Sequence, residues 1–380
     1  MFSFRRESSF DIPGASFHAS PMRKGMAFIG MAWVVTWLVA MHPSRLLAWD
    51  YDYHRMVNQV ALQSLPAEFP DWIRDPAVRE RIAFLAGDPD RWRNLGDATL
   101  RHVNVPEHFI DLDDLPKYGL TIESLSPFRS EYLGQLAIAR SKNPERFPEA
   151  DPSRDPDRTR GIPGLLPWRI TEDFARLQST FSSIKAYEQF GGTPDEIANA
   201  RANAVYLMGV MGHFIGDTAQ PLHTSRHYNG WVGENPKGYT TNKTFHGWVD
   251  GGYLRKVGFR YAEISGQVRP ARLVWDRLPG VSHEHLFPVV MHYVVEQSHD
   301  LERVYQLDKT GNLSGEGADG GTGREFLAGQ IVRGGQMLGD VWYTAWKTAP
   351  KDTFLQSQLA RRAGEESPKS QVQGPKAGTN

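Results

Sequence analysis

One short run constrains this chain more than any other: Met211-Gly-His213-Phe-Ile-Gly-Asp217-Thr-Ala-Gln-Pro221-Leu-His223. His213 and Asp217 stand four residues apart at the end of a long helical pattern. This spacing stacks an imidazole and a carboxylate on one helix face, as a shared metal ion requires. Pro221 cannot continue the helix, so His223 would leave on the following turn and reach the same cavity from another side.

A second pair, His246 and Asp250, repeats the four-residue spacing. Two such pairs joined by His223 indicate a multinuclear metal site, and in a hydrolase such a site clamps a phosphate ester. The competing interpretation is that these are core or surface histidines on two unrelated helices. A single His-x3-Asp pair favours that interpretation, whereas the combination favours the metal site.

The composition limits how a metal could be held. The chain has 380 residues and no cysteine. Disulfides, thiolate zinc sites and a cysteine nucleophile are therefore excluded, and any metal must bind His, Asp, Glu or backbone groups. Such ligands suit zinc but also admit manganese or cobalt.

The N-terminus is typical of a targeting segment. A short basic region at 22–24 precedes a nearly unbroken apolar run over 26–40, and Ala48 is a small residue suited to cleavage. The run is short for a bilayer span and right for a signal peptide, although an uncleaved anchor is the alternative. We expect residues 1–48 to be a signal peptide with an N-terminal extension, and the mature chain to be secreted or periplasmic, without an integral membrane anchor.

The mature chain would be mildly acidic. Cleavage after Ala48 leaves 38 basic and 42 acidic residues, a net charge of about −4. This balance argues against a strongly basic duplex-DNA binder, whose affinity rests on neutralising phosphates. It remains compatible with a single-stranded substrate held by metals and stacking.

The remaining pattern predicts an all-α protein. Apolar residues recur at helical spacing over 53–64, 78–86, 128–140, 169–188, 195–218, 283–306 and 324–347. We expect a single-domain helical bundle over 49–350, a surface excursion at 142–166, a glycine-rich loop at 308–323 and a disordered tail over 351–380.

Two further segments supply candidate ligands. Cleavage would leave Trp49 with a free amine next to its own carbonyl, and these two atoms can chelate one metal beside His54. The second is Gly87-Asp88-Pro89-Asp90, followed by Glu107-His108-Phe109-Ile110-Asp111. Asp88 competes with Asp90 as the carboxylate ligand, and His102 competes with His108.

With these motifs the chain resembles the zinc-dependent phospholipase C and S-one/P-one nuclease superfamily. The resemblance spans roughly residues 49 to 257 and rests on four motifs: Trp49-x4-His54, His108-Phe-Ile-Asp111, His213-x3-Asp217-x5-His223 and His246-x3-Asp250. It implies a helical bundle of that type with three zinc ions. The interval from His108 to His213 is longer than in the compact nucleases, and 142–166 is the expected insertion, which could reshape the substrate cleft.

The resemblance also implies a ligand set. One zinc would be held by Asp90, His108, His213 and Asp217. Asp217 would bridge to a second zinc on Trp49 and His54, and a third would bind His223, His246 and Asp250. A hydroxide between the bridged ions would be the nucleophile, since bound zinc lowers the pKa of water from about 15.7 to about 7.

Several features resemble the nuclease branch, including the Trp-x4-His start and Asp at position 250. In that branch Phe109 would stack on a base, Asp111 would accept from exocyclic amines, and Arg93 would contact the scissile phosphate. Core packing of Phe109 and a solvated Arg93 are the alternatives. We expect a secreted endonuclease or 3′-nucleotidase acting on single-stranded DNA, RNA or nucleotides, with no stable protein partner.

Two other functions remain open. The first is a phospholipase C acting on phospholipid head groups, although no domain-sized lipid-binding segment follows residue 348. The second is a non-catalytic secreted helical protein with structural metals. Chelation separates the second from an enzyme, because an enzyme would lose a turnover that zinc restores.

Overall fold

The computed structural model describes residues 51–148, 151–317 and 321–366. They all lie in one of the two units into which the chain divides, 46–380. The expected signal peptide at 1–48 and Trp49 lie outside the described residues. Among the described helices, none is long and apolar enough to cross a membrane.

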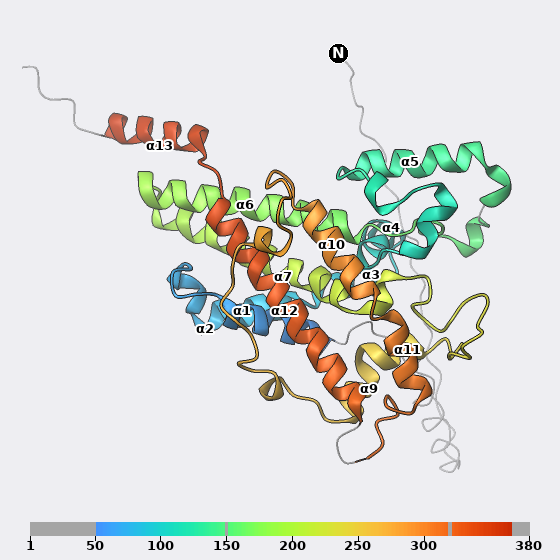
Figure 1. The fold of residues 1–380 in the computed structure, drawn as a ribbon. Helices are drawn as coiled ribbons and strands as arrows, with labels where there is room; N and C mark the ends of the chain where they lie inside the picture. The colour runs from blue at the N-terminus through green and yellow to red at the C-terminus, as the bar shows by residue number, and fades with distance from the viewer. Residues whose placement is uncertain (1–50, 149–150, 318–320, 367–380) are drawn as a thin grey trace, which may run out of the picture. The chain divides into compact units, whose positions relative to one another are not determined.

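The described residues are mostly helical, which confirms the all-α expectation. The longer helices are α1 (Tyr51–Ser64), α2 (Pro76–Leu85), α5 (Arg129–Lys142), α6 (Leu166–Phe190), α7 (Pro194–Ala219), α10 (Phe287–Ser298), α11 (Leu301–Lys309), α12 (Thr322–Thr348) and α13 (Thr353–Glu366) (Figure 1). Shorter ones are α3 (Asp88–Asn94), α4 (Ala98–Asn104), α8 (Phe245–Gly247) and α9 (Tyr253–Lys256). Within the described ranges the only β contact is an isolated antiparallel bridge between Ile110 and Gly164.

The ends of α7 follow from its sequence. At its start the Thr193 hydroxyl accepts a hydrogen bond from the Glu196 amide (3.2 Å), and the Glu196 carboxylate accepts one from the Thr193 amide (2.8 Å). This reciprocal capping satisfies two amides that have no partner within the helix. At its end Gln220 is extended (ψ 113°), as a residue before proline prefers. Pro221 then opens a short helical turn, η7 (Pro221–Thr224), which carries His223.

Helix α1 packs against α12, α7 and α2, and Figure 1 shows it next to α2. Glycines permit this close approach. A Cβ on Gly212 of α7 would lie 1.6 Å from Asn58 Oδ1, and one on Gly335 of α12 would lie 2.3 Å from Val60 Cγ1. The buried Asn58 amide donates to the carbonyls of Ile82 (2.8 Å) and Gly209 (3.0 Å), which ties α1 to α2 and α7.

Gly212→Ala is therefore expected to destabilise the fold by about 2–3 kcal/mol, because the added methyl displaces a buried, hydrogen-bonded Asn58. The free energy of unfolding in urea would measure this loss. Gly329→Ala in α12 is the matched control, because nothing lies within 4 Å of its added Cβ. Alanine there should stabilise the helix by about 0.5–1 kcal/mol. Equal effects of the two substitutions would contradict the close-packing account.

Two expectations about helix boundaries are wrong. The predicted helix over 283–306 is two helices, α10 and α11, and the chain turns at His299 and Asp300. Both helices contact η7, but α10 also packs on α6 and α7, whereas α11 packs on α12. Asp300 accepts a hydrogen bond from Arg333 of α12 (2.9 Å), which holds the turn in place. Apolar periodicity continues through this turn because both helices bury a face.

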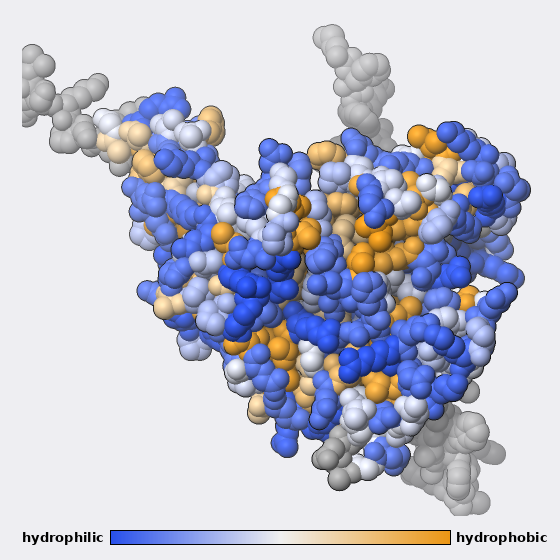
Figure 2. Space-filling model, in the orientation of Figure 1, coloured by the Kyte–Doolittle hydropathy of each residue, from blue (hydrophilic) through white to orange (hydrophobic). Residues whose placement is uncertain are grey.

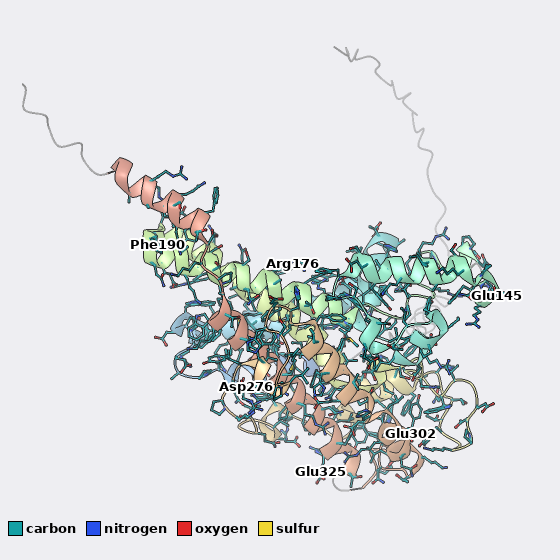
Figure 3. The ribbon with its side chains drawn as sticks, turned by 45° about the horizontal axis from the view of Figure 1, so that its top comes forward. Glu145, Arg176, Phe190, Asp276, Glu302 and Glu325 are labelled. Carbon is teal, nitrogen blue, oxygen red and sulfur yellow. The ribbon has the colours of Figure 1, made fainter. Side chains whose placement is uncertain are left out.

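The expected disordered tail over 351–380 is wrong for 353–366, which form α13. This helix packs on α6, next to the end that Phe190 labels in Figure 3. Leu359 is buried, and Arg362 donates to both oxygens of Glu196 at 3.0 Å. The polar composition of this segment did not predict a helix. Its few apolar residues, such as Leu359, become buried because the helix packs on α6. Residues 367–380 lie outside the described part.

The surface is mixed in character. On the face seen in Figure 2, hydrophobic residues form separate patches divided by hydrophilic side chains. The core beneath is built from the inward faces of the long helices and includes Trp168, Trp342 and Tyr305. Eight of the predicted ligand residues, all in the described part of the chain, lie where α1, α3, α7 and the segments after α4 and α7 converge.

Candidate metal centre

Asp217, in the last turn of α7, is at the centre of the site and is fully buried. Its Oδ1 faces His54 Nε2 of α1 at 3.5 Å and His223 Nε2 of η7 at 3.7 Å. Its Oδ2 faces His108 Nδ1 at 3.0 Å and His213 Nε2 at 3.3 Å. Each carboxylate oxygen thus meets two imidazoles, an arrangement suited to bridging two cations.

The structure brings eight of the nine predicted ligands together, in three groups. Within each group the candidate ligand atoms all lie within 4.8 Å of one another. The groups are His54, His213 and Asp217; Asp90, His108 and His213; and His223, His246 and Asp250. His213 belongs to two groups and Asp217 touches the third through His223, so the groups are contiguous. The ninth predicted ligand, Trp49, lies outside the described residues.

The alternative ligand candidates, Asp88 or Asp90 and His102 or His108, lie in different surroundings. Asp90 in α3 is buried, and its Oδ1 lies 3.8 Å from His213 Nε2 and 4.0 Å from His108 Nδ1. Asp88, on the same helix, pairs instead with Arg91. His102 Nδ1 contacts the carbonyl oxygen of Asp157 at 2.8 Å and lies outside the three groups.

The third group is built on a short helical stretch. His246 lies in α8, and Asp250 lies in the following π-helical turn, η8 (Trp248–Gly252). His246 Nε2 lies 2.7 Å from Asp250 Oδ2, and His223 Nε2 lies 3.5 Å from the same oxygen. The four-residue spacing that suggested a pair in the sequence thus does place both side chains together, with His223 joining them from η7.

Backbone carbonyls orient two of the histidines. His213 Nδ1 donates to the Ala86 carbonyl oxygen (2.8 Å), and His223 Nδ1 donates to that of His108 (2.6 Å). Each bond turns the other ring nitrogen, Nε2, toward Asp217. Metal-binding histidines are held in this way, with the distal N–H on an oxygen and the remaining lone pair facing the ion.

Helix packing also positions His54. Its ring stacks on that of His213, with centroids 3.7 Å apart and planes inclined by 22°. The two helices approach closely because position 216 is glycine: a Cβ there would lie 2.9 Å from His54 Nδ1. A larger residue at 216 would displace the His54 imidazole from its group with His213 and Asp217.

The electrostatics of the site are those of a cation-binding centre. Burial alone would raise the pKa of Asp217, but the charges of His223 and His213 and a hydrogen bond from His108 hold it well below its ordinary value. Burial, together with the neighbouring imidazole of His213, lowers the pKa of His54 well below its usual value. An ionised Asp217 and a neutral His54 are in the ligand state that metal binding requires. His223 differs: burial lowers its pKa, but the charge of Asp217 outweighs this and raises the pKa to about 9, so a metal there would have to displace its proton.

Buried atoms without hydrogen bonds also suit this site to a cation. Among the described residues, Asp217 Oδ1, His108 Nε2 and His223 Nε2 are buried and have no hydrogen-bond partner. Leaving such atoms unpaired costs about 1–3 kcal/mol each. They gather in one centre, beside other donors suited to a metal, so a cation bound there could satisfy them.

A cavity of about 390 Å³ opens beside the metal centre. His108, His223 and His246 form part of its wall. The other lining residues are Arg93, Val105, Phe109, Asp111, Asp114, Thr159, Arg160, Gly161, Ile162, Leu222 and Tyr228. Its volume falls in the range of small-molecule and cofactor sites, about 300–1,000 Å³. A larger depression of about 770 Å³ lies by Arg55 and Arg255, and none of the eight grouped ligands lines it.

The predicted substrate residues line this cavity. Phe109 is partly buried and stands apart from the hydrophobic core cluster, so core packing does not account for it. Asp111 lies two residues further on, also partly buried. Arg93 lines the cavity too, but its guanidinium pairs with Asp90 Oδ1 at 2.6 Å, so it is not a solvated surface arginine.

Asp111 has an unusual acidity. Burial and the nearby carboxylates of Asp114 and Asp113 raise its pKa to about 8. Between about pH 4 and pH 8 the unfolded chain has lost this proton while the folded chain keeps it. The free energy of unfolding therefore falls as pH rises through that window and levels off above it.

This fall of the free energy of unfolding with pH can be tested on the metal-free protein. The melting temperature of Asp111→Asn, relative to wild type, should be higher at pH 9 than at pH 5 by on the order of 5 °C. Asp71→Asn serves as the control because its side chain is 94% exposed. A difference that does not change with pH would contradict the raised pKa.

Sequence reasoning missed part of the cavity wall. Tyr228 is 49% exposed and sets its ring edge-to-face with His246, at 5.5 Å between centroids. An aromatic five residues after a ligand histidine was a readable signal. Thr159, Arg160 and Ile162 were missed because they belong to the presumed surface excursion. His227 stacks on Trp231 and lies outside the three groups.

No family model, curated protein or solved structure matches the chain.

Proposed function

We propose that this protein is a zinc-dependent phosphodiesterase of the phospholipase C/P-one nuclease type that hydrolyses single-stranded nucleic acids or 3′-nucleotides. One observation carries the proposal: three contiguous His/Asp groups meet at Asp217 and border a cavity that Phe109 and Asp111 also line. A metal centre that served only to stabilise the fold would not require an adjoining cavity with an aromatic ring.

The donor set fits zinc. Imidazole and carboxylate are ligands that zinc accepts, and the orientation of His213 and His223 leaves Nε2 of each for a metal. We propose one ion on Asp90, His108, His213 and Asp217; a second on Asp217, His54 and the Trp49 amine and carbonyl; and a third on His223, His246 and Asp250. Zinc held there would lower the pKa of a bound water to about 7 and offset charge on a phosphate.

The protein's own residues would place the substrate. Phe109 offers an aromatic face beside the metal centre, and stacking of a base on such a ring contributes about 1–3 kcal/mol whatever the base. Asp111, when ionised, accepts from an exocyclic amine. Arg93, held by Asp90, presents positive charge at the cavity wall, where a scissile phosphate would lie.

The remaining expectations are part of the same proposal. Processing near Ala48 would free the Trp49 amine and release the chain outside the cytoplasm, in the periplasm or the medium. The net charge of about −4 for the mature chain supports a substrate held by metals and stacking, since duplex-DNA binders commonly carry a basic balance that neutralises phosphates.

The decisive experiment is hydrolysis by the zinc-loaded chain starting at Trp49, with single-stranded DNA and phosphatidylcholine tested side by side and a chelated control. Chelator-sensitive cleavage of DNA alone is the expected result. Cleavage of phosphatidylcholine alone would overturn the nuclease assignment in favour of a phospholipase C. Hydrolysis of neither, with unfolding on chelation, would mean that the metals are structural.

A further inference from the structure

The stretch after α5 contains a tightly built segment, residues 155–162, which we call the pocket rim. Asp155 and Asp157 are only 5% and 6% exposed. Asp155 Oδ1 accepts from the amides of Thr159 (3.0 Å) and Arg160 (3.2 Å), and Asp157 Oδ1 accepts from the Thr159 hydroxyl (3.0 Å). The expected surface excursion is therefore an ordered turn around two buried carboxylates.

The backbone of the pocket rim is strained at one residue. Arg158 has φ 57°, the only positive φ of a non-glycine residue in the described part of the chain. Such a conformation costs of order 1–3 kcal/mol and persists where the surroundings enforce it. The residues on either side of it, Asp157 and Thr159, are joined by a side-chain hydrogen bond that supports this turn.

The pocket rim is fastened to both sides of the cavity. On one side, Arg101 of α4 donates to Asp157 Oδ2 (2.8 Å) and to the Arg93 carbonyl oxygen (3.0 Å). On the other, the residues following the rim join the segment that carries Phe109 and Asp111: the Asp111 amide donates to the Pro163 carbonyl oxygen at 2.5 Å. In Figure 1 the chain returns from the end of α5 past α4 to the start of α6.

Glycine at 164 makes the second junction possible. Its φ of 113° lies in the region that favours glycine, and a Cβ there would stand 2.0 Å from the Phe109 carbonyl oxygen. The segment can therefore lie against the backbone of Phe109. Thr159 to Ile162 consequently line the same cavity as His108, His223 and His246.

Arg160 is the cation that the pocket rim brings to this cavity. Its side chain is exposed, and it forms no ion pair with any residue that the structure describes. Neighbouring arginines differ: Arg93 pairs with Asp90 and Arg101 with Asp157. The exposed Asp151 carboxylate is close enough to be influenced by the charge of Arg160 but forms no ion pair with it. An arginine on a rigid turn at a cavity wall is suited to an anion from solution, and its guanidinium matches a phosphate.

We propose that Arg160 binds the phosphate next to the scissile one, so that the preferred substrate is an oligonucleotide rather than a nucleoside monophosphate. This inference rests on the proposed function and deepens it. The metal centre and Arg93 would hold the scissile phosphate, and Phe109 and Asp111 the nucleoside. Arg160 lies on the segment that is joined to Phe109 and Asp111. In an oligonucleotide, the next phosphate follows the nucleoside that Phe109 and Asp111 would hold, and Arg160 would bind it there.

The kinetic test compares Arg160→Ala with Arg154→Ala, a control on the same stretch whose side chain is 77% exposed and does not line the cavity. For a zinc-loaded enzyme and a tetranucleotide, Arg160→Ala should raise KM about fivefold with kcat unchanged. A 3′-nucleoside monophosphate should be hydrolysed as by wild type. The slope of log KM against log salt should fall in magnitude by about 0.7, the value for one lost phosphate contact on a single strand.

A binding test avoids turnover altogether. Nuclease-resistant phosphorothioate tetranucleotides, each with one linkage replaced by an uncharged methylphosphonate, are titrated by fluorescence anisotropy. Wild type and Arg154→Ala should lose about fivefold in affinity at one linkage, and Arg160→Ala should lose nothing further there. Unchanged melting temperature checks that the variant is folded.

The outcomes separate the two proposals. Hydrolysis of neither substrate by wild type would overturn the proposed function, while the methylphosphonate series would still report on Arg160. Equal losses for Arg160→Ala and Arg154→Ala, or an equal loss on the nucleoside monophosphate, would overturn the assignment of Arg160 to the neighbouring phosphate.

Discussion

Asp217→Asn is expected to lower the turnover of single-stranded DNA by at least about a hundredfold while the helical fold persists. The carboxylate stands between four imidazoles, and both of its oxygens are used: Oδ1 faces His54 and His223, and Oδ2 faces His108 and His213. An asparagine of nearly the same shape fills the space but brings no negative charge and presents an amide nitrogen to one pair of rings. His213→Ala, which removes a member of two groups, should have a similar effect.

Steady-state kinetics and circular dichroism of the two variants would measure this. Asp88→Asn is the matched control, because Asp88 lies two residues from Asp90 on the same helix yet pairs with Arg91 outside the three groups. It should retain near-normal turnover. Near-normal turnover in Asp217→Asn or His213→Ala would refute the site assignment.

Removal of metal is expected to abolish turnover and to lower the melting temperature by on the order of 10 °C, with both restored by zinc. A ligand at a hundred times its Kd stabilises a protein by about 2.7 kcal/mol per site, and the proposed centre would have three such sites. The physical source is the group of buried atoms, including Asp217 Oδ1 and His223 Nε2, that have no hydrogen bond within the described residues.

Elemental analysis would count the metals alongside calorimetry. The chain starting at Trp49 should bind three zinc ions. The same chain with one alanine added before Trp49 is the matched control: it should bind two tightly, because the chelating amine becomes a peptide nitrogen. Turnover that survives complete chelation, or an equal metal count in the two chains, would argue against this ligand set.

Much of the fold could be predicted because burial repeats with the helical period. The patterns over 169–188 and 195–218 match α6 and α7, and Thr193, Pro194 and Glu196 mark the start of α7 by local hydrogen bonding alone. The failures have one cause. The turn at His299 and Asp300 and the helix α13 depend on partners far along the chain, Arg333 and Glu196 respectively.

The candidate ligands were predictable for a similar reason. A separation of four residues within one helix fixes two side chains on one face, so His213 and Asp217 form a pair in any fold that keeps the helix. Asp88 and Asp90 could not be separated in this way, because they lie two residues apart on one short helix. Only the packing of α3 against α7 directs Asp90 toward His213.

What the sequence by itself determined is therefore local: the helical class, the capping of α7, the His-x3-Asp pairs and the absence of thiolate ligands. Tertiary structure alone decided which segments meet at Asp217, that Asp90 rather than Asp88 lies there, and that the pocket rim brings Arg160 to the cavity. The physical reason is the distance along the chain over which each kind of interaction acts. Helical spacing and capping act over a few residues, whereas the approach of α1 to α7 at Gly212 and Gly216 joins positions more than a hundred and fifty residues apart.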